Sequence, residues 1–182
     1  DVNNNIEIKK EIELLKSQAD RCRNILLTLS KNPQDLNDSF LNKTTVSNLI
    51  KVSFNKFNRK NIKLIVNIKN KNNEPTIFYK DEIVYALGNI IQNSIQHSKN
   101  EVLIEINWNE KDFFIKIIDD GKGFEVETLD QIGKPYISNT EKGMGLGIFI
   151  AINLIDSIGG SISFKNQKNV GAVVEFTINR VT

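Results

Sequence analysis

The sequence contains two carboxamide side chains at a spacing that could hold a cation. Asn89 and Asn93 are four residues apart, so a helix would stack them on one face, and His97 continues the same stripe. Carboxamide oxygens are neutral ligands of the kind that Mg²⁺ accepts together with several waters. In a chain this rich in Asn, such a pair also arises on an ordinary solvated face. The pair therefore needs support from other motifs.

A second candidate motif is Asp119-Asp-Gly-Lys-Gly123, at the end of an expected strand. Gly121 and Gly123 allow a tight turn and a close approach of the backbone to a flat ligand. The carboxylate of Asp119 could there accept the exocyclic amine of an adenine ring. The alternative is an ordinary turn, since Asp-Gly pairs are common turn formers.

A third motif, Gly143-Met-Gly145-Leu146-Gly147, opens an apolar helix expected over residues 148–158. The free N–H groups at a helix N-terminus carry partial positive charge and suit phosphate oxygens. A flexible hinge is the alternative interpretation. The spacing fits neither a Rossmann nor a P-loop pattern, and no Gly-Lys-Ser/Thr follows.

Hydrophobic periodicity predicts the elements that must position these three motifs. They are helix 46–54, strand 61–70, a short apolar stretch at 76–79, helix 81–98, strands 101–108 and 112–119, helix 148–158, and strands 161–165 and 172–178. Thr44 or Thr45 can cap the first helix, and Asp81 can open the second. This order predicts an α+β domain, in which helices cover one face of a mixed β-sheet.

The N-terminal region predicts a long helix with a partner. Between residues 6 and 30 an apolar seam recurs at alternating steps of four and three residues, which is a heptad pattern. Cys22 lies in this seam, where the simplest interpretation is a small hydrophobic core residue. The flanking Arg21 and Arg23 would also lower the pKa of its thiol and make it more reactive. We expect residues 1–31 to form a dimerisation helix, 32–43 a linker, and 44–182 a separate domain.

Composition excludes several classes of protein. A net charge of +2 with interspersed acids and bases gives no electrostatic footprint for nucleic acid. No apolar run approaches the ~20 residues needed to span a bilayer, so we expect no direct membrane contact. One Cys excludes an internal disulfide but permits an intermolecular one, and it fits a reducing, cytoplasmic compartment. With one His and one Cys, a zinc site within one chain is not expected.

Taken in order, the three motifs resemble the N, G1 and G2 boxes of the Bergerat-type (GHKL) ATP-binding fold, which gyrase, Hsp90, MutL and histidine kinases share. The resemblance covers about residues 44–180, and Pro135-Tyr136 is similar to the F-box region of the family's lid. It implies ATP and Mg²⁺ as ligands. Residue by residue, it implies that Asn93 holds Mg²⁺, Asn89 lies beside the phosphates, and Asp119 reads adenine. It also implies that Gly143 to Gly147 hinge a lid over the nucleotide.

One position separates the branches of that family. Its hydrolysing members carry a Glu four positions before the metal Asn, as general base toward water. Here that position is Asn89, and an amide cannot take a proton, so the sequence favours the histidine kinases over a gyrase- or MutL-type ATPase. Many sensor kinases have Lys or Arg three residues after the metal Asn, where this chain has Gln96. Lys122 and Lys142 are therefore the candidate phosphate-neutralising cations.

The N-terminal helix carries a second resemblance. Gln18-Ala-Asp-Arg-Cys22-Arg-Asn-Ile-Leu26 is similar to the Q-x-x-R-C-R-x-I-L box of RegB/PrrB-type redox-responding sensor kinases, and Gly133-Lys-Pro135-Tyr136 is similar to their lid. In that family the box lies on the second dimerisation helix, and its Cys is a redox switch. The first helix, which bears the phosphoacceptor His, is absent from this sequence. His97 is better explained as a packing or phosphate-neighbour residue than as an acceptor.

We therefore expect the catalytic fragment of a two-component sensor histidine kinase, unable to phosphorylate itself. The intact protein would be a homodimer through the N-terminal helix, anchored in the inner membrane, with a response regulator as partner. The alternatives are a redox-sensitive dimerisation module with vestigial nucleotide binding, or an ATPase of the gyrase/MutL type.

Overall fold

The computed structural model describes residues 43–54, 62–69, 73–129, 131–135, 146–168 and 170–180. The chain divides into two units, Asp1–Asp38 and Ser39–Thr182, and every described residue belongs to the second. The predicted heptad helix with Cys22 lies outside the described residues, as do Gly143, Gly145 and Lys142. No helix among the described residues is long and apolar enough to cross a membrane.

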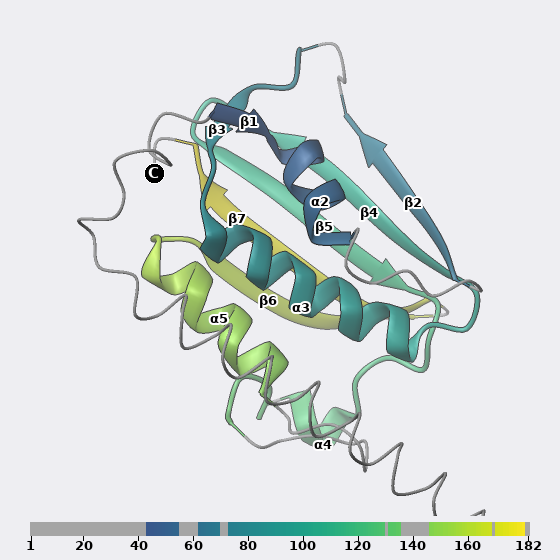
Figure 1. Cartoon of the computed structure of the whole chain (residues 1–182). Coiled ribbons are helices and arrows are strands. Elements are labelled where there is room, and N and C mark those ends of the chain that lie inside the picture. Colours follow the sequence, from purple (N-terminus) through teal and green to yellow (C-terminus); the bar gives the residue numbers. More distant parts are fainter. Residues whose placement is uncertain are drawn as a thin grey trace, which may run out of the picture. The chain divides into compact units, whose positions relative to one another are not determined.

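A five-stranded mixed sheet forms one layer of the domain (Figure 1). Its strands, in spatial order, are β2 (Lys63–Ile68), β4 (Glu101–Trp108), β5 (Asp112–Asp119), β7 (Gly171–Asn179) and β6 (Ser161–Gln167). Only the β2–β4 pair is parallel, and the other pairs are antiparallel. A separate two-stranded ribbon pairs β1 (Lys43–Thr45) with β3 (Thr76–Phe78).

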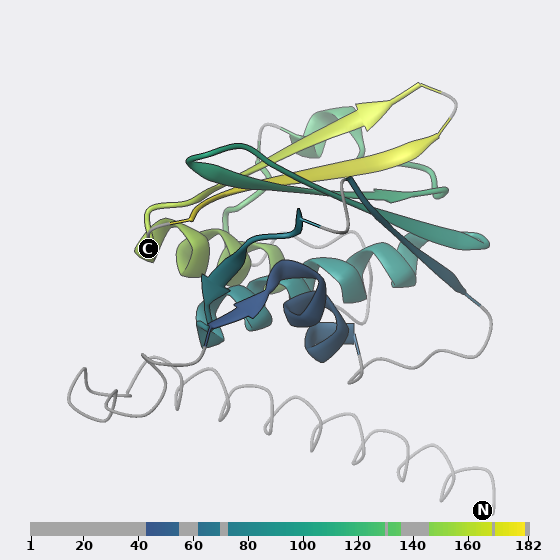
Figure 2. The same cartoon turned by 90° about the horizontal axis from the view of Figure 1, so that it is seen from above.

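Helices form the second layer, on one face of the sheet. They are α2 (Val46–Phe54), α3 (Asp81–His97) and α5 (Gly147–Ser157), and all three lie on the same side of the sheet in Figure 2. A short helix, α4 (Val126–Leu129), follows the end of β5. The predicted α+β architecture is confirmed. β1 and α4 were not predicted, and β1 takes in Lys43, the last residue of the predicted linker.

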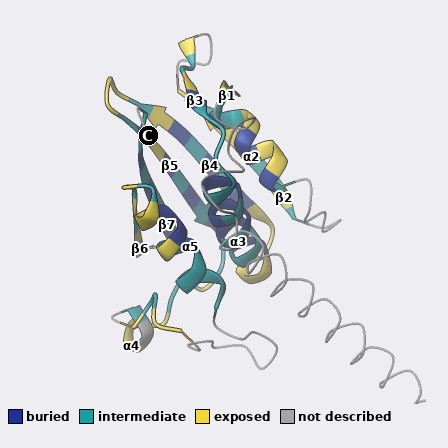
Figure 3. Cartoon of the chain, turned by 60° about the vertical axis from the view of Figure 1, so that its left-hand side comes forward, coloured by how far each residue is buried: buried dark blue, intermediate teal, exposed yellow. Residues whose placement is uncertain are grey.

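The core lies between the two layers, because alternate strand residues face the helices (Figure 3). On β4 and β5 the paired residues Ile104 and Ile117 are buried, as are Ile106 and Ile115. The helix side contributes the buried face of α3 and parts of α2 and α5.

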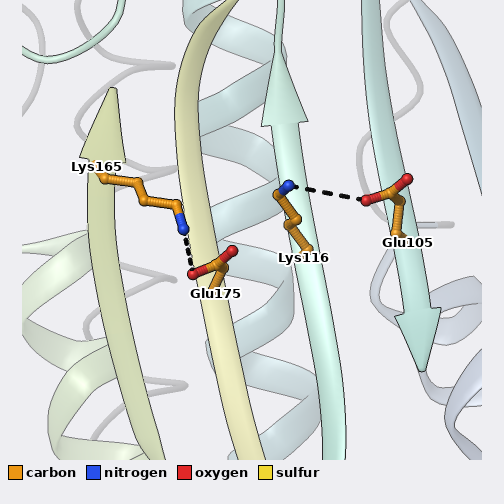
Figure 4. Close-up of polar contacts among 4 residues, drawn as sticks. All are labelled: Glu105, Lys116, Lys165 and Glu175. Atoms are coloured by element: carbon orange, nitrogen blue, oxygen red, sulfur yellow. Dashed lines mark hydrogen bonds and ion pairs between the residues drawn. The ribbon is translucent and has the colours of Figure 1, made fainter. Parts of the chain in front are cut away.

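The opposite face of the sheet is charged. Neighbouring strands present Glu105, Lys116, Glu175 and Lys165 on this side (Figure 4). Lys165 Nζ lies 2.7 Å from Glu175 Oε2, and Lys116 Nζ lies 4.0 Å from Glu105 Oε2. α2, α3 and α5 lie on the other side of the sheet, and this row of four charged side chains is partly exposed.

The ends of α2 and α5 follow the residue chemistry expected from the sequence. Thr45 Oγ1 accepts a hydrogen bond from the Asn48 N–H at 3.3 Å, as an N-cap does. α5 ends at Ser157, and Gly159, two residues later, has a φ of +74°, a left-handed conformation that glycine adopts without strain. The Gly160 N–H then returns to the Ile155 carbonyl at 2.9 Å and closes the helix end.

Candidate functional site

The two carboxamides lie on the partly exposed stripe of α3. Asn89 and Asn93 are half-buried, and His97 at the end of the stripe is exposed. The other side of the same turns is fully buried, at Ile90, Ile91, Ser94 and Ile95. This division is the one that the sequence spacing predicted, with the amides toward solvent and the aliphatic side chains in the core.

Neighbouring helices hold α3 in place. α3 packs against both α2 and α5, and it also contacts β5. The buried hydroxyl of Ser53 on α2 shares its one proton between two carbonyl oxygens, Leu49 O at 2.8 Å and Val84 O at 3.1 Å, so it ties α2 to α3. A buried hydroxyl with two acceptors satisfies its polar atom and links the helices. The amide stripe is therefore carried by a rigid element.

Asp119 is the last residue of β5 and one of the few buried charged or polar side chains, 3% exposed. Its Oδ1 accepts backbone N–H groups from Gly121 at 3.0 Å and from Ala172 at 3.2 Å. Among the described residues no hydrogen bond reaches Oδ2. The side chain is thus fixed through one oxygen, while the other keeps its capacity to accept a hydrogen bond.

Burial raises the pKa of the Asp119 carboxyl above its ordinary value. The two backbone N–H groups and the nearby His97 lower this pKa in part, and Asp120 raises it further. Carboxyl groups with a raised pKa are frequent at functional sites, which makes Asp119 a candidate binding residue.

The two glycines of the turn make close contacts that no side chain could share. A Cβ atom on Gly121 would overlap the carbonyl oxygen of His97 and stand 2.9 Å from Asp119 Oδ1. Gly123 has a φ of +80°, and a Cβ atom there would stand 2.6 Å from Asn166 Oδ1. The structure thus shows both glycines in close contact within the protein, Gly121 with the backbone of His97 and Gly123 with Asn166, while the predicted approach to a flat ligand stays a prediction. The turn also places Asp119 next to the C-terminal end of α3.

The first N–H groups of α5 have no carbonyl partner within the helix, as at any helix N-terminus. Leu146 precedes its first residue, Gly147, with φ −96° and ψ −21° and no side-chain cap. Figure 1 shows α5 running alongside α3. Of the predicted G2 motif, only Leu146 and Gly147 are among the described residues.

Three contributors to this region were not found by sequence reasoning. Asp120 accepts the backbone N–H groups of Lys99 at 2.7 Å and Asn100 at 2.9 Å, which fixes the loop after α3 to the end of β5. Gly171 lies against Asp119, where a Cβ atom would overlap the Asp119 carbonyl oxygen. Asn166 pairs with the backbone of Phe124. Of these three residues, only Asp120 stands in a recognisable sequence motif, Asp119-Asp120-Gly121, and that motif predicts no more than a turn.

Asn89 and Asn93 offer amide oxygens of the kind that a hard cation accepts. In the part of the chain that the structure describes, no group of three or more His, Cys, Asp or Glu could hold a metal ion. Amide oxygens such as those of Asn89 and Asn93 suit Mg²⁺, which usually takes its remaining ligands from water and substrate phosphates. Lys122, one of the two candidate cations, is exposed.

Comparison with known proteins gives consistent relatives. The family model described as histidine kinase-, DNA gyrase B-, and HSP90-like ATPase matches residues 79–182. The sensor histidine kinase RegB of Cereibacter sphaeroides is 27% identical over 174 residues, which cover 87% of this chain and 37% of RegB. Sporulation kinase D of Bacillus subtilis is 30% identical over 101 residues, covering 54% of this chain and 20% of that protein. The chain thus spans little more than a third of the length of RegB.

Solved structures share the fold. The catalytic domain of histidine kinase ThkA superposes with a TM-score of 0.67 at 22% identity, covering 76% of this chain and 95% of that one. The Acinetobacter baumannii histidine kinase AdeS gives a TM-score of 0.68 at 17% identity, covering 95% of this chain and 82% of that one. The family match covers more than half of the chain and includes α3, the Asp119 turn and α5. The chain belongs to the histidine kinase-, DNA gyrase B- and HSP90-like ATPase family, and its α+β domain is a catalytic ATP-binding domain of the sensor histidine kinase type.

Proposed function

We propose that this chain binds ATP with Mg²⁺ and positions the γ-phosphoryl group for transfer to a histidine on a helix outside this sequence. The observation that carries the proposal is the buried Asp119 carboxylate, fixed through Oδ1 and without a hydrogen bond from the described residues at Oδ2. It lies at the end of β5, in a turn that abuts the end of the helix carrying Asn89 and Asn93. Such a group is suited to read an adenine amine.

We assign the adenine contact to Asp119 Oδ2. An ionised carboxylate only accepts hydrogen bonds, and the N6 amine of adenine only donates them in this direction. Gly121 and Gly123 hold the turn that aims this oxygen. An acceptor on a largely buried side chain discriminates against a ring that presents another acceptor, because the bound ring would shield the carboxylate from water and leave it unpaired.

We assign the phosphate end to α3 and to the segment before α5. Asn93 would give its amide oxygen to Mg²⁺, and Asn89 would lie beside the phosphates. The segment from Gly143 to Gly147 would hinge the lid, and the free N–H groups at the start of α5 suit phosphate oxygens. The cation would spread the charge that develops on the transferred phosphoryl group.

Kinase chemistry is favoured over hydrolysis for one residue-level reason. Asn89 occupies the position from which a Glu would activate water, and an amide cannot accept that proton. The relatives named RegB and sporulation kinase D are kinases by their names. A steady-state ATPase activity of the isolated chain would instead support the gyrase- or MutL-type alternative.

Calorimetric titration with a non-hydrolysable ATP analogue, with and without Mg²⁺, tests the proposal. We expect Mg²⁺-dependent binding that Asn93→Ala abolishes. Gln92→Ala, on the same helix, is the matched control and should retain binding. Unchanged affinity in Asn93→Ala would remove Asn93 from the site, and no binding by wild type at millimolar nucleotide would overturn the whole proposal.

Incubation with γ-labelled ATP tests the missing acceptor. We expect no autophosphorylation, because the proposed acceptor histidine lies on a helix outside this sequence. The one histidine of the chain, His97, is the last residue of α3 and is assigned a packing or phosphate-neighbour role. Acid-labile phosphate on His97 would contradict this assignment.

A second candidate function concerns Cys22, which lies outside the described residues. The Cys-containing box resembles that of redox-responding kinases, and the match to RegB extends well beyond the ATP-binding region, to 87% of this chain. We propose that oxidation links two copies through Cys22 and so regulates the kinase. Non-reducing gels of wild type and Cys22→Ser after mild oxidation should show a dimer band only for wild type. A band of equal strength in Cys22→Ser would exclude the switch.

The remaining proposals concern the intact protein. We infer a homodimer through the N-terminal helix and a response regulator that receives the phosphoryl group. We also infer that the domain works on the cytoplasmic side of the inner membrane, to which the longer protein would be anchored. Size-exclusion chromatography of this chain with and without residues 1–31 tests the dimer.

A further inference from the structure

The carboxamide of Asn166 forms a two-point pair with the backbone of Phe124. Asn166 Oδ1 accepts the Phe124 N–H at 2.7 Å, and Asn166 Nδ2 donates to the Phe124 carbonyl oxygen, also at 2.7 Å. The two residues are 42 positions apart in the sequence. The side chain thus uses its donor and its acceptor as the backbone of a neighbouring strand would.

Two further contacts fix the same point. The ring of Phe124 meets the ring of Phe164 edge to face, with centroids 5.8 Å apart and an interplanar angle of 84°. Gly123 has a φ of +80° and no room for a side chain against Asn166 Oδ1. Phe164 and Asn166 share one face of β6, two residues apart. The chain that leaves the Asp119 turn is therefore held at Phe124 by one edge strand.

The other end of the turn is held from the same hairpin. Ala172 on β7 gives its N–H to Asp119 Oδ1, and Ala172 is the direct cross-strand partner of Asn166. One paired position of the β6–β7 hairpin thus anchors both Asp119, through Ala172, and Phe124, through Asn166. Between these anchors lie Gly121 and Gly123, the conformationally free residues of the turn.

We propose that Asn166 is a positioning residue of the nucleotide site, which sets the geometry of the turn from Asp119 to Phe124. The inference rests on the proposed function, because it deepens the role of that turn. The proposed role of Asn166 is to hold the turn through Phe124 and not to contact the nucleotide. It limits the backbone conformations that two glycines would otherwise allow. The turn therefore loses less conformational entropy when the nucleotide binds.

The hydrogen bonds of Asn166 are exposed, so an effect of Asn166 on nucleotide affinity can be measured apart from an effect on the stability of the fold. Exposed hydrogen bonds contribute modestly to folding, since water replaces them when they are lost. Removing the carboxamide should therefore leave the sheet intact while it frees the turn. Gln167, next to Asn166 on the opposite face of β6, is also exposed and offers a matched control.

The experiment compares Asn166→Ala with Gln167→Ala in the full chain. We expect Asn166→Ala to weaken Mg²⁺-dependent binding of the ATP analogue about tenfold, equivalent to about 1.4 kcal/mol, and to speed hydrogen exchange of the Phe124 amide. Gln167→Ala should keep wild-type affinity and exchange. Asn166→Asp keeps an acceptor for the Phe124 N–H but loses the donor to its carbonyl oxygen, so its Phe124 amide should remain partly protected.

Each outcome decides the proposal. Wild-type affinity in a folded Asn166→Ala variant whose Phe124 amide exchanges faster would overturn the positioning role while the proposed function stands. Unchanged Phe124 exchange would show that the pair does not hold the turn, and equal loss of binding in Gln167→Ala would show a general effect of the strand. Failure of wild type itself to bind nucleotide would overturn the proposed function and this inference together.

Discussion

Gly171 lies so close to Asp119 that the first residue of β7 has room for no side chain. A Cβ atom at Gly171 would overlap the Asp119 carbonyl oxygen and stand 2.8 Å from its Oδ1. The same Oδ1 accepts the N–H of the next residue, Ala172. The conformation of the carboxylate that we assign to adenine is therefore dictated by the start of a strand more than fifty residues later.

Gly171→Ala should disturb the site more than the fold. Relieving the overlap requires β7 to move away from Asp119, and overpacking of this kind costs about 1–3 kcal/mol. We expect nucleotide affinity to fall at least tenfold, as measured by calorimetry. The control is Gly159→Ala, where φ is +74° and no atom lies within 4 Å of the added Cβ. That variant should lose about 1 kcal/mol of stability through backbone strain and keep its affinity.

Asp119→Asn should lose nucleotide without losing stability. The amide can still accept the Gly121 and Ala172 N–H groups through Oδ1, but it presents an NH₂ group to the adenine amine. Hydrogen bonds to charged groups are worth about 1.5–3 kcal/mol, so we expect affinity to fall roughly ten- to a hundredfold. Asp112→Asn makes the same change at the other end of β5 and should leave affinity unchanged.

The raised pKa of Asp119 sets the pH dependence. A carboxyl whose pKa is higher in the folded than in the unfolded state stabilises the fold at low pH, below the unfolded pKa, and loses this contribution as the pH rises through the folded pKa. At neutral pH the buried charge is therefore a cost, and Asp119→Asn should be as stable as wild type or more so by urea unfolding. Wild-type affinity for nucleotide should fall on acidification, beginning above the ordinary aspartate value of 3.8.

The main elements of the fold could be predicted because their signals are local. β4 and β5 alternate buried residues with half-buried or exposed ones, so their bounds at 101–108 and 112–119 were predicted as observed. The amphipathic pattern of α3 likewise gave its extent and the face that carries Asn89 and Asn93. β1 and α4 have three and four residues, too few for any periodicity to appear.

The supports of the site could not be predicted because their partners are distant in sequence. Asp120 meets Lys99 across 21 positions, and Asn166 meets Phe124 across 42. Nothing near Asn166 in the sequence distinguishes it from the other asparagines of this chain. The role of Asn166 can be recognised only in the folded sheet, where β6 and β7 lie next to the end of β5.

Lys165→Met tests whether the charged face of the sheet matters to either stability or binding. Its ion pair with Glu175 is 2.7 Å long but well exposed, at 54% and 36% of the two side chains. Exposed pairs contribute about 0–1 kcal/mol and are screened by salt, so we expect a small loss of stability that vanishes near 1 M NaCl. Affinity should not change, although Lys165 is the neighbour of Asn166. A loss beyond about 1 kcal/mol would show that the four charges in Figure 4 act as a network.

Asp120→Asn should reveal how far the end of α3 depends on the turn. Desolvation alone would raise the pKa of Asp120, but the backbone N–H groups of Asn100, Lys99 and Glu101 hold it below its ordinary value. The ionised form is therefore favoured in the folded state. Its stabilising contribution is present above the unfolded pKa near 3.8 and is lost as the pH falls through the lower, folded pKa.

The asparagine keeps an acceptor oxygen but not the charge, so we expect a loss of about 1 kcal/mol at neutral pH. The difference from wild type should shrink on acidification below pH ~4, where the carboxyl of the unfolded chain becomes protonated, and should vanish below the lower, folded pKa. Urea unfolding at several pH values measures it, and Glu110→Gln in the exposed β4–β5 turn is the control for removing a carboxylate. Asp120 joins the loop after α3 to the turn that contains Gly121. Affinity for nucleotide should therefore fall severalfold when this link is weakened. A stability loss independent of pH would mean that the carboxylate charge does not hold this loop.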